Sequence, residues 1–510
     1  MLARLHSVTL EGIDGVICEV EVDVARGGFD KAVIVGLPDT AVKESIERVR
    51  SAILNCGYSY PKTQSVINLA PADVKKVGPA FDLPIALGIL MGQGTLAKPD
   101  LHGTVVLGEL ALDGRVRPVN GVLSMAMTAA AEGFTRMIVP LENAGEAAVV
   151  DGMEVFAVGS LTQAVAFLAG QLALETTTVD IEALLQDSST YEVDFGEVKG
   201  QENVKRALTV AAAGGHNIMM IGPPGAGKTM LAQRLATILP PLSLPESLET
   251  TRIYSSVGLL EKGKALLATR PVRMPHHSAS GPALIGGGTT PRPGELSLAH
   301  YGILFLDEFV EFPRHVLEMI RQPLEDGFVI VSRAKKTIRF PASFMLVAAM
   351  NPCPCGYFGS HAQRCKCTPG QIARYLSKVS GPLVDRIDIH IEVPAISFAR
   401  LRSSSAQLDS AAMRQSVMKA RQIQAARFGR LKILTNARMT HKQTERYCRL
   451  DAPAELILRQ AMMEFGLSAR AHDKVCKVAR TIADLEGSDD IRPEHVAEAI
   501  SYRKLDRKLQ

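Results

Sequence analysis

The residues with the clearest chemical signature lie near the middle of the chain. Eight consecutive residues fit the spacing G-x-x-x-x-G-K-[ST]: Gly222, Pro223, Pro224, Gly225, Ala226, Gly227, Lys228 and Thr229. Residues 217–221 predict a strand before this segment, and residues 228–239 predict a helix after it. In that context backbone N–H groups surround phosphate oxygens, the lysine reaches the β- and γ-phosphates, and the hydroxyl ligates Mg²⁺. The sequence therefore predicts a site for ATP and Mg²⁺.

Polar side chains follow two further strands of the same predicted sheet. Asp307 and Glu308 come directly after the apolar residues 303–306, and Asn351 follows residues 344–350. The carboxyl ends of parallel strands face the ligand crevice of an open sheet. We expect Asp307 to hold Mg²⁺ through water, Glu308 to polarise the attacking water, and Asn351 to orient that water or contact the γ-phosphate. Taken alone, each of these residues would be an ordinary turn residue.

Four of the eight cysteines form a tight group. Cys353 and Cys355 make one C-x-C pair, and Cys365 and Cys367 make a second, nine residues later. In a reducing compartment such a group favours a metal over disulfides, and four thiolates would bind structural Zn²⁺ tetrahedrally with no open position for catalysis. The spacing is tighter than the usual C-x₂-C, so unliganded thiols are the alternative. His361 lies between the pairs as a substitute ligand.

Composition limits the class of protein. At about 150 residues per domain, 510 residues predict several domains. Hydrophobic residues make up 46% and charged residues 22%, so the chain can bury cores, and a net charge of +4 does not by itself indicate nucleic-acid binding. The apolar stretches are too short or too interrupted for a spanning helix, and the first residues lack the apolar region of a signal peptide. We therefore expect a cytoplasmic protein without a membrane segment.

Hydrophobic periodicity divides the chain into regions that must position these residues. Residues 16–24 alternate as a half-buried strand does, residues 32–35 predict a strand, and residues 40–55 predict a helix. The predicted fold class is α/β multidomain. Its regions are a first domain at 1–174, a polar linker at 175–194, an α/β core with a parallel sheet at 195–395, and a helical C-terminal region at 396–510 whose last helix begins at Pro493.

Five long segments carry a family resemblance: VGLPDTAVKESIERVRSAI, GQENVKRALTVAAAGGHNIMMIGPPGAGKTM, PGELSLAHYGILFLDE, NPCPCGYFG and SGPLVDRIDIHIEVP. They resemble AAA+ ATPases of the magnesium-chelatase and minichromosome-maintenance branch, and within it the ComM/YifB competence-associated group. The resemblance covers essentially the whole chain. It implies that Asn351 is sensor 1, that Arg386 is an arginine finger, and that Arg470 is sensor 2 on a helical lid. An arginine finger acts on a neighbour's nucleotide, so the resemblance also implies a ring, usually a homo-hexamer.

Two inserts of the AAA+ core are candidates for contact with DNA. Residues 274–302 carry three consecutive glycines, Gly286 to Gly288, and resemble the helix-2 insert of this branch. Residues 328–331 and 337–340 predict a hairpin that resembles the pre-sensor-1 hairpin. The cations at its tip, which would contact phosphates without reading sequence, are Arg333, Lys335 and Lys336. A mobile loop and a solvated charged turn are the alternatives.

The first domain resembles a Lon-type protease domain, which has a ribosomal-S5-domain-2-like fold. The resemblance lies in residues 75–83 and 107–119. Where the family has its nucleophilic serine this chain has Ala80 and Phe81, and the region of the activating lysine reads G-V-L-S at residues 121–124. We therefore expect a degenerate scaffold that lacks the catalytic pair, and Lys75 and Lys76 to form a solvated turn.

Three functions follow from these observations. The leading hypothesis is a ring-forming ATPase that translocates on single-stranded or branched DNA, as a helicase or branch-migration motor in recombination or natural transformation. The alternative is a chelatase-like subunit that remodels a protein partner, and the third is a Lon-type protease. No small-molecule substrate other than ATP is expected.

Overall fold

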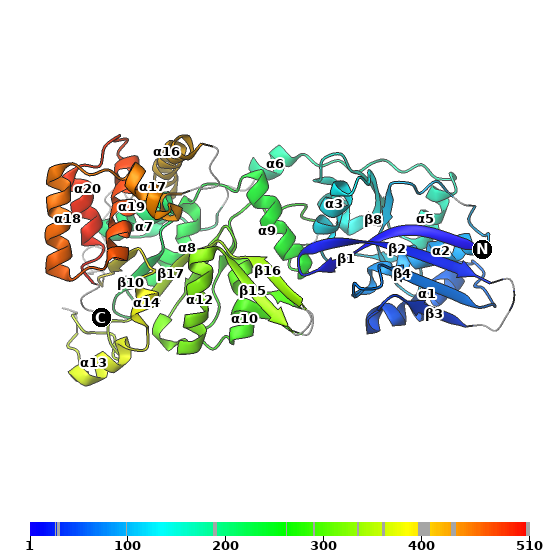
Figure 1. Cartoon of the computed structure of the whole chain (residues 1–510), viewed down its shortest axis with the longest axis horizontal. Helices are drawn as coiled ribbons and strands as arrows, with labels where there is room; N and C mark the ends of the chain where they lie inside the picture. The colour runs from blue at the N-terminus through cyan, green and yellow to red at the C-terminus, as the bar shows by residue number, and fades with distance from the viewer. Residues whose placement is uncertain are drawn as a thin grey trace. The chain divides into compact units, whose positions relative to one another are not determined.

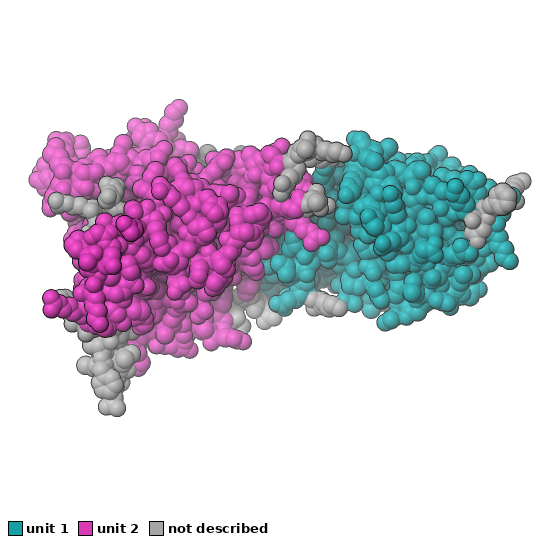
Figure 2. All heavy atoms as spheres, turned by 90° about the horizontal axis from the view of Figure 1, so that it is seen from below, with its two compact units in different colours: residues 1–187, 243–268 teal, residues 188–242, 269–510 magenta. Residues whose placement is uncertain are grey.

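The computed structural model forms two compact units (Figure 2). Unit 1 comprises residues 1–187 and 243–268, and unit 2 comprises residues 188–242 and 269–510. The residues that the structure describes are 1–25, 27, 31–97, 99–186, 191–261, 263–288, 291–333, 336–359, 363–395, 408–429 and 435–505.

Unit 1 is built on a mixed sheet with the strand order β3-β4-β2-β1-β5-β8-β9 (Figure 1). Its long hairpin pairs β1 with β2 from Leu2↔Asp23 to Glu11↔Asp14. The alternation predicted for residues 16–24 is confirmed, because Cys18, Val20 and Val22 are buried on one face of β2. The strands are β1 (Leu2–Glu11), β2 (Asp14–Val24), β3 (Ala32–Val35), β4 (Ser65–Ala70), β5 (Thr104–Val106), β8 (Arg136–Pro140) and β9 (Glu154–Val158).

Helices cover this sheet, and a small separate hairpin joins β6 to β7. The helix α1 begins where the sequence predicts, because the Asp39 side chain accepts a hydrogen bond from the backbone N–H of Val42 at 2.8 Å. Every residue of α2 is buried, which explains its uniformly apolar sequence. The elements are α1 (Thr40–Asn55), α2 (Asp82–Gly92), β6 (Glu109–Leu110), β7 (Val116–Arg117), α3 (Val122–Ala131), α4 (Ala144–Ala148), α5 (Leu161–Leu168) and α6 (Ile181–Gln186).

A helix from the middle of the chain completes unit 1. In sequence α9 (Leu244–Ser256) lies between the phosphate loop and Asp307, within the region predicted as the ATPase core. Its Ser255 hydroxyl accepts from the backbone N–H of Gly121 at 2.9 Å and donates to the buried carboxylate of Glu146. Arg252 of α9 donates to Asp14 at 2.6 Å. Residues 243–268 therefore pack as part of the N-terminal unit.

One prediction about unit 1 is wrong. Lys76 was expected in a solvated turn, but its side chain is fully buried and its ammonium donates to the carbonyl of Pro71. Burial lowers the pKa of Lys76, while nearby Cys18 and Asp73 oppose that shift. The backbone around Lys76 pairs with Pro38, so the lysine lies in the packed edge of the sheet.

Unit 2 contains the predicted parallel sheet, with the order β11-β14-β17-β10-β18. All four neighbouring pairs are parallel, so the carboxyl ends of the strands meet at one edge. Such a sheet is buried on both faces, which accounts for the continuous apolar runs in its central strands. The strands are β10 (Ile218–Ile221), β11 (Val272–Arg273), β14 (Ile303–Leu306), β17 (Met345–Met350) and β18 (Ile389–Glu392), and the main flanking helices are α7 (Glu202–Gly214), α8 (Lys228–Ile238) and α12 (Arg314–Asp326).

The C-terminal region is helical, as predicted, and shares one hydrophobic core with the sheet. Buried side chains such as Val417 and Val475 belong to the same cluster as Leu231 and Ile218. The helices are α16 (Ser410–Phe428), α17 (His441–Tyr447), α18 (Ala452–Phe465), α19 (Ala469–Leu485) and α20 (Pro493–Ser501). Across the described part of the chain, no helix is long and apolar enough to cross a membrane.

The two predicted inserts form small elements of unit 2. The pre-sensor hairpin is present as β15 (Phe328–Arg333) paired with β16 (Lys336–Pro341), and it leads directly into β17. Lys335 lies outside the described residues, as do the side chains of Arg333 and Lys336. The other insert contains α10 (Gly281–Ile285), β12 (Gly286–Gly287), β13 (Arg292–Pro293) and α11 (Glu295–Leu298), and two further helices, α13 (Pro369–Leu376) and α14 (Gly381–Val384), follow β17.

Candidate functional site

The phosphate loop connects β10 to the N-terminus of α8 and lines a cavity of about 400 Å³. A Cβ atom built on Gly225 or Gly227 would meet no atom within 4 Å, and both glycines have positive φ angles of 74° and 85°. The loop thus leaves open space at the positive end of a helix, as an anion cradle requires. The residues that line the cavity are Pro224, Gly225, Ala226, Gly227, Lys228, Thr229, Met230, Asp307, Glu308, Met350 and Asn351.

Lys228 is held at the rim of this cradle. Its ammonium donates to the carbonyls of Gly222 at 2.8 Å and Pro223 at 3.0 Å, and to Oδ1 of Asn351 at 3.0 Å. Only 9% of the side chain is exposed. Burial lowers the pKa of Lys228, and the charge of Asp307 opposes that shift. A poorly hydrated cation in this position fits a phosphate group well.

The two predicted magnesium ligands lie side by side. The Thr229 hydroxyl donates to Oδ2 of Asp307 at 2.6 Å, although the residues are far apart in sequence. The other carboxylate oxygen of Asp307 accepts from the backbone N–H of Glu308 at 2.9 Å. A hydroxyl and a carboxylate at the edge of a phosphate cradle are the hard oxygen ligands that Mg²⁺ prefers. The residues present therefore fit MgATP.

Glu308 has a partner that the sequence did not indicate. Its backbone is left-handed, with φ of 49°, and its side chain is 58% exposed at the edge of the cavity. One carboxylate oxygen lies 3.2 Å from Nδ1 of His277, in the segment between β11 and α10. The ring of His277 stacks on that of His276 at 4.1 Å between centroids. The expected catalytic carboxylate is thus linked to the glycine-containing insert.

Gln201 makes a second contact that the sequence did not indicate, with the backbone of the phosphate loop. Gln201 precedes α7 with a left-handed backbone, φ 61°, and its side-chain amide donates to the carbonyls of Ala226 at 2.9 Å and Pro394 at 3.2 Å. The Gly-Gln pair before α7 is the local signal, since an unusual backbone angle at a polar residue often marks a functional site.

The two candidate arginines do not line this cavity in their own chain. The Arg386 guanidinium pairs with Glu325 on α12 at 2.8 Å and donates to the carbonyl of Pro382 at 2.8 Å, and it is only 12% exposed. Arg470 lies exposed in the first turn of α19. The structure therefore assembles Lys228, Thr229, Asp307, Glu308 and Asn351 at one site and leaves both arginines elsewhere.

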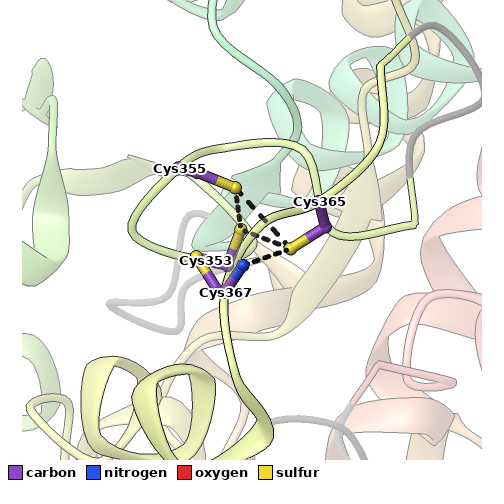
Figure 3. A group of neighbouring side chains, drawn as sticks. All are labelled: Cys353, Cys355, Cys365 and Cys367. Atoms are coloured by element: carbon purple, nitrogen blue, oxygen red, sulfur yellow. Dashed lines mark hydrogen bonds between the residues drawn. The ribbon is translucent and has the colours of Figure 1, made fainter.

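The four cysteines converge as a metal site requires (Figure 3). Their sulfur atoms all lie within 4.8 Å of one another, with Cys353–Cys355 at 3.4 Å, Cys353–Cys365 at 3.7 Å and Cys355–Cys365 at 3.6 Å. Tetrahedral Zn²⁺ with Zn–S bonds of about 2.3 Å separates its sulfurs by about 3.8 Å. The group therefore fits a zinc site. His361, the alternative ligand, lies outside the described residues.

Backbone groups also favour thiolates in this loop. The N–H of Phe358 points to the sulfur of Cys353 at 3.3 Å, and the N–H of Cys367 points to that of Cys365 at 3.4 Å. Hydrogen bonds from the backbone of Lys366 and Tyr357 lower the pKa of Cys355 to about 6. A backbone hydrogen bond also lowers the pKa of Cys365 and of Cys367, but burial and the neighbouring sulfurs outweigh it, so both values are raised. Thiolate is the form that binds metals.

The region of unit 1 that resembles a protease active site is filled with apolar side chains. Ala80 is buried in a cluster with Val105 and Val122. Ser124 is also buried, and its hydroxyl accepts a 3.3 Å hydrogen bond from Arg252 of α9. Within the described residues no serine and lysine meet at this position, which argues against the protease hypothesis.

Known proteins are similar to this chain over its whole length. Family models described as "Magnesium chelatase, subunit ChlI", "Subunit ChlI of Mg-chelatase" and "Magnesium chelatase, subunit ChlI C-terminal" match residues 194–401, 20–143 and 407–503. Competence protein ComM of Haemophilus influenzae is 44% identical over 100% of this chain and 99% of its own length, and YifB of Salmonella typhimurium is 43% identical over 100% and 98%. The magnesium-chelatase 38 kDa subunit of Rhodobacter capsulatus is 28% identical over 31% of this chain and 50% of its own length.

Proposed function

The chain belongs to the ComM/YifB family of magnesium-chelatase-type AAA+ ATPases, and from that premise we propose that it is a ring-forming motor that couples ATP hydrolysis to translocation on DNA. The proposed substrate is single-stranded or branched DNA in the cytoplasm, and the proposed task is unwinding or branch migration during recombination or natural transformation. ATP is the only small-molecule substrate in this proposal.

We assign the hydrolytic roles from the contacts at the cavity. Lys228 holds the β- and γ-phosphates, and Thr229 and Asp307 hold Mg²⁺, which neutralises charge on the phosphates when bound. Glu308 accepts a proton from the attacking water. The water oxygen bonds to the γ-phosphorus, and the bond between the γ-phosphorus and the β–γ bridging oxygen breaks, which releases ADP. Asn351 orients that water or contacts the γ-phosphate. The 3.0 Å contact of Asn351 with Lys228 supports a shared task for these two side chains.

We assign Arg386 to the nucleotide of a neighbouring chain. Its guanidinium lies in a contact with Glu325, outside the cavity of its own chain, so a second copy is needed for it to meet a γ-phosphate. Repeating that head-to-tail interface generates a ring, for which a homo-hexamer is the expected size. Arg470 is proposed to contact the nucleotide as well, of its own chain or of the neighbour.

The observation that carries the DNA proposal is that both inserts connect to the hydrolytic residues. The glycine-containing insert places His277 3.2 Å from Glu308. The β15–β16 hairpin leads into β17, and Asn351 directly follows the last residue of β17. A strand of DNA that displaces either insert would therefore act on a hydrolytic side chain through a short, packed connection.

The loop that contains Cys353 and Cys355 is proposed to hold structural Zn²⁺ with Cys365 and Cys367. The support is the four-sulfur geometry and the near absence of a hydrophobic core in the loop. Of its described residues from 353 to 367, only Cys353 and Gly356 are buried. A metal would supply the stabilisation that burial does not.

A chelatase-like remodeller of a protein partner remains the second candidate. The similarity to the magnesium-chelatase 38 kDa subunit of Rhodobacter capsulatus favours it. The two functions differ in what the inserts contact: phosphates in a DNA motor and a protein surface in a remodeller.

Replacing Arg333, Lys335 and Lys336 together with alanine tests the proposal. We expect basal ATP hydrolysis to remain, while stimulation by DNA and unwinding of forked or four-way DNA fall together. Each lost phosphate contact should flatten the log-log salt dependence of DNA binding by about 0.7 to 0.9. Fluorescence anisotropy over a salt series measures that slope.

A matched control removes three exposed cations from another part of unit 2, Lys442, Arg446 and Arg449. This control changes the net charge by the same amount. Because it leaves the hairpin cations intact, the log-log salt dependence of DNA binding should stay close to that of the wild type. Unchanged DNA affinity and salt slope in the hairpin variant would contradict the DNA motor and favour the remodeller.

A further inference from the structure

The four-cysteine loop touches the phosphate loop directly. Gly356 lies between Cys355 and Tyr357 with φ of 83°, and a Cβ atom at this position would lie 2.5 Å from Cδ and 3.2 Å from Cγ of Pro224. Such a distance is shorter than any normal carbon contact, so the backbone of Gly356 rests on the proline ring. The backbone N–H of Gly356 also donates to the carbonyl of Cys353 at 2.9 Å. The turn that joins the first two cysteines is therefore the turn that supports the phosphate loop.

A second connection runs through Asn351. Cys353 follows Asn351 by two residues, and Oδ1 of Asn351 accepts a hydrogen bond from Lys228 at 3.0 Å. On the far side of the loop, α13 begins two residues after Cys367 and carries the buried Tyr375. Burial raises the pKa of Tyr375 to about 12, and the backbone of Asn351 beside the Tyr375 hydroxyl opposes that shift. Both ends of the cysteine loop thus contact the segment that holds Lys228.

The loop has little to hold this shape except its sulfurs. Among the described residues of the loop, the exposed ones include Pro354, Phe358 and Lys366. A cation that binds four thiolates would fix the ends of the loop to one another and restrict the turn at Gly356. Without it, the turn would be free to move away from Pro224 and Asn351.

We propose that the four-cysteine loop is an effector site for a thiophilic divalent cation, and that its occupancy sets the affinity of the neighbouring phosphate loop for nucleotide. The inference rests on the zinc site of the proposed function and goes beyond it, because a structural metal need not affect nucleotide binding. Coupling of this kind is reciprocal, so bound nucleotide must strengthen cation binding by the same factor.

Substitutions at two glycines of the same loop distinguish the effect of the contact with Pro224 from the effect of backbone strain alone. Gly356 and Gly359 have similar positive φ angles, 83° and 78°, but the nearest atom to a Cβ at Gly359 is the Glu392 carboxylate at 4.0 Å. Both Gly356→Ala and Gly359→Ala add backbone strain, whereas only Gly356→Ala pushes on Pro224. We expect Gly356→Ala to weaken binding of a fluorescent ADP on the order of tenfold, within the range typical of coupled sites. Gly359→Ala should bind ADP nearly as the wild type does, and both variants should retain zinc.

The effect of the bound cation on nucleotide affinity is tested with the full-length protein. Elemental analysis should find about one zinc per chain, and Cys353→Ser with Cys365→Ser should remove the zinc and weaken ADP binding. Cys56→Ser, which changes a half-buried thiol of unit 1, is the matched control. The rate at which zinc passes to a chromophoric chelator should fall when saturating ADP and Mg²⁺ are present.

The outcomes separate this inference from the function it rests on. A chain that binds no zinc at any added concentration overturns the zinc site and the inference together. A chain that binds zinc, while ADP affinity is the same in Gly356→Ala, in the double cysteine variant and in the wild type, overturns the inference alone. Circular dichroism of each variant shows that it is folded.

Discussion

The proposed roles assign binding and hydrolysis of ATP to different residues at this site. Lys228 lies within the phosphate loop, whereas Glu308 lies at the open edge of the cavity and does not contact Lys228. We therefore expect Lys228→Ala to lose nucleotide binding, and Glu308→Gln to bind ATP and Mg²⁺ with near-normal affinity and to hydrolyse it at least about 100-fold more slowly. Isothermal titration and a phosphate-release assay measure the two effects.

A nearby acidic residue provides the control for that experiment. Glu311 pairs with Lys378 at 3.1 Å and does not line the cavity. Glu311→Gln should leave turnover close to wild type. Normal turnover in Glu308→Gln would show that another group activates the water.

His277 should affect the rate of hydrolysis more than the binding of ATP. Its imidazole contacts the Glu308 carboxylate at 3.2 Å and does not touch the phosphate loop. We expect His277→Ala to lower kcat about tenfold, a loss of about 1.4 kcal/mol in positioning the carboxylate, with little change in KM for ATP. His276→Ala, which removes the stacked neighbour, should have a smaller effect. A rise in KM with unchanged kcat would assign His277 to nucleotide binding instead.

The sequence predicts the residues of the site whose spacing is local. Lys228 and Thr229 belong to one motif, and Asp307 and Asn351 each follow a strand, so the parallel sheet is enough to bring them together. Contacts such as His277 with Glu308 and Arg386 with Glu325 could not be predicted. They depend on the tertiary position of the glycine-containing insert and of α12, which the hydrophobic periodicity of the sequence does not predict.

At the scale of elements, α9 shows where periodicity stops being informative. Its N-terminus has a capping box, Ser243 with Glu246, and one face of the helix is apolar, which are both local features. They do not say which core the helix joins, because Leu244 and Leu248 would suit either. In the structure these leucines pack with Leu123 and Val149 of unit 1. Complementary side chains far apart in sequence decided the outcome.

An ion pair attaches α19 to the sheet, and its removal should be costly. Lys474 of α19 lies 2.9 Å from Asp388, which also accepts from the backbone N–H of Asn217 at 3.0 Å. Lys474→Met would leave the Asp388 carboxylate without its cation in a site that is only 12% exposed. We expect a loss of about 3 to 5 kcal/mol in the free energy of unfolding. Urea denaturation measures it, with Lys442→Met, at an exposed position, as the control.

The ion pair between Lys474 and Asp388 also predicts how the free energy of unfolding changes with pH. Burial alone would raise the pKa of Asp388, but Lys474 and His216 hold it well below its usual range. Its stabilising contribution is therefore complete above the unfolded-state pKa of about 3.9 and is lost as the pH falls below that value. Without Lys474, burial should raise the pKa of Asp388 in the folded variant above its unfolded-state value. The difference between wild type and Lys474→Met should therefore shrink between neutral pH and pH 4, because protonation of Asp388 in the variant removes the unpaired charge. A difference that stays constant from neutral pH to pH 4 would contradict this assignment.

At the scale of the whole molecule, the chain contains a complete phosphate loop and an arginine that its own cavity does not use. Arg386 is held by Glu325 and by the carbonyl of Pro382, and its Nε atom is buried without a hydrogen-bond partner. In the proposed ring the guanidinium leaves this pair to meet a neighbour's γ-phosphate, and the unsatisfied Nε makes the observed position less stable and so easier to leave. Hydrolysis should therefore depend on assembly even though ATP binding does not.

Mixing two inactive variants tests this dependence. Arg386→Ala should bind ATP and fail to turn it over, and Lys228→Ala should fail to bind it. In a randomly mixed ring, roughly a quarter of the interfaces join the intact phosphate loop of one variant to the intact arginine of the other, so turnover should reappear in proportion to those interfaces. Subunit exchange, followed by energy transfer between labelled chains, must be verified in the same sample. If the exchanged mixture stays inactive at every ratio, Arg386 acts within its own chain or has no role in hydrolysis. The cavity of a single chain would then have to supply all the charge that the transferring phosphoryl group requires.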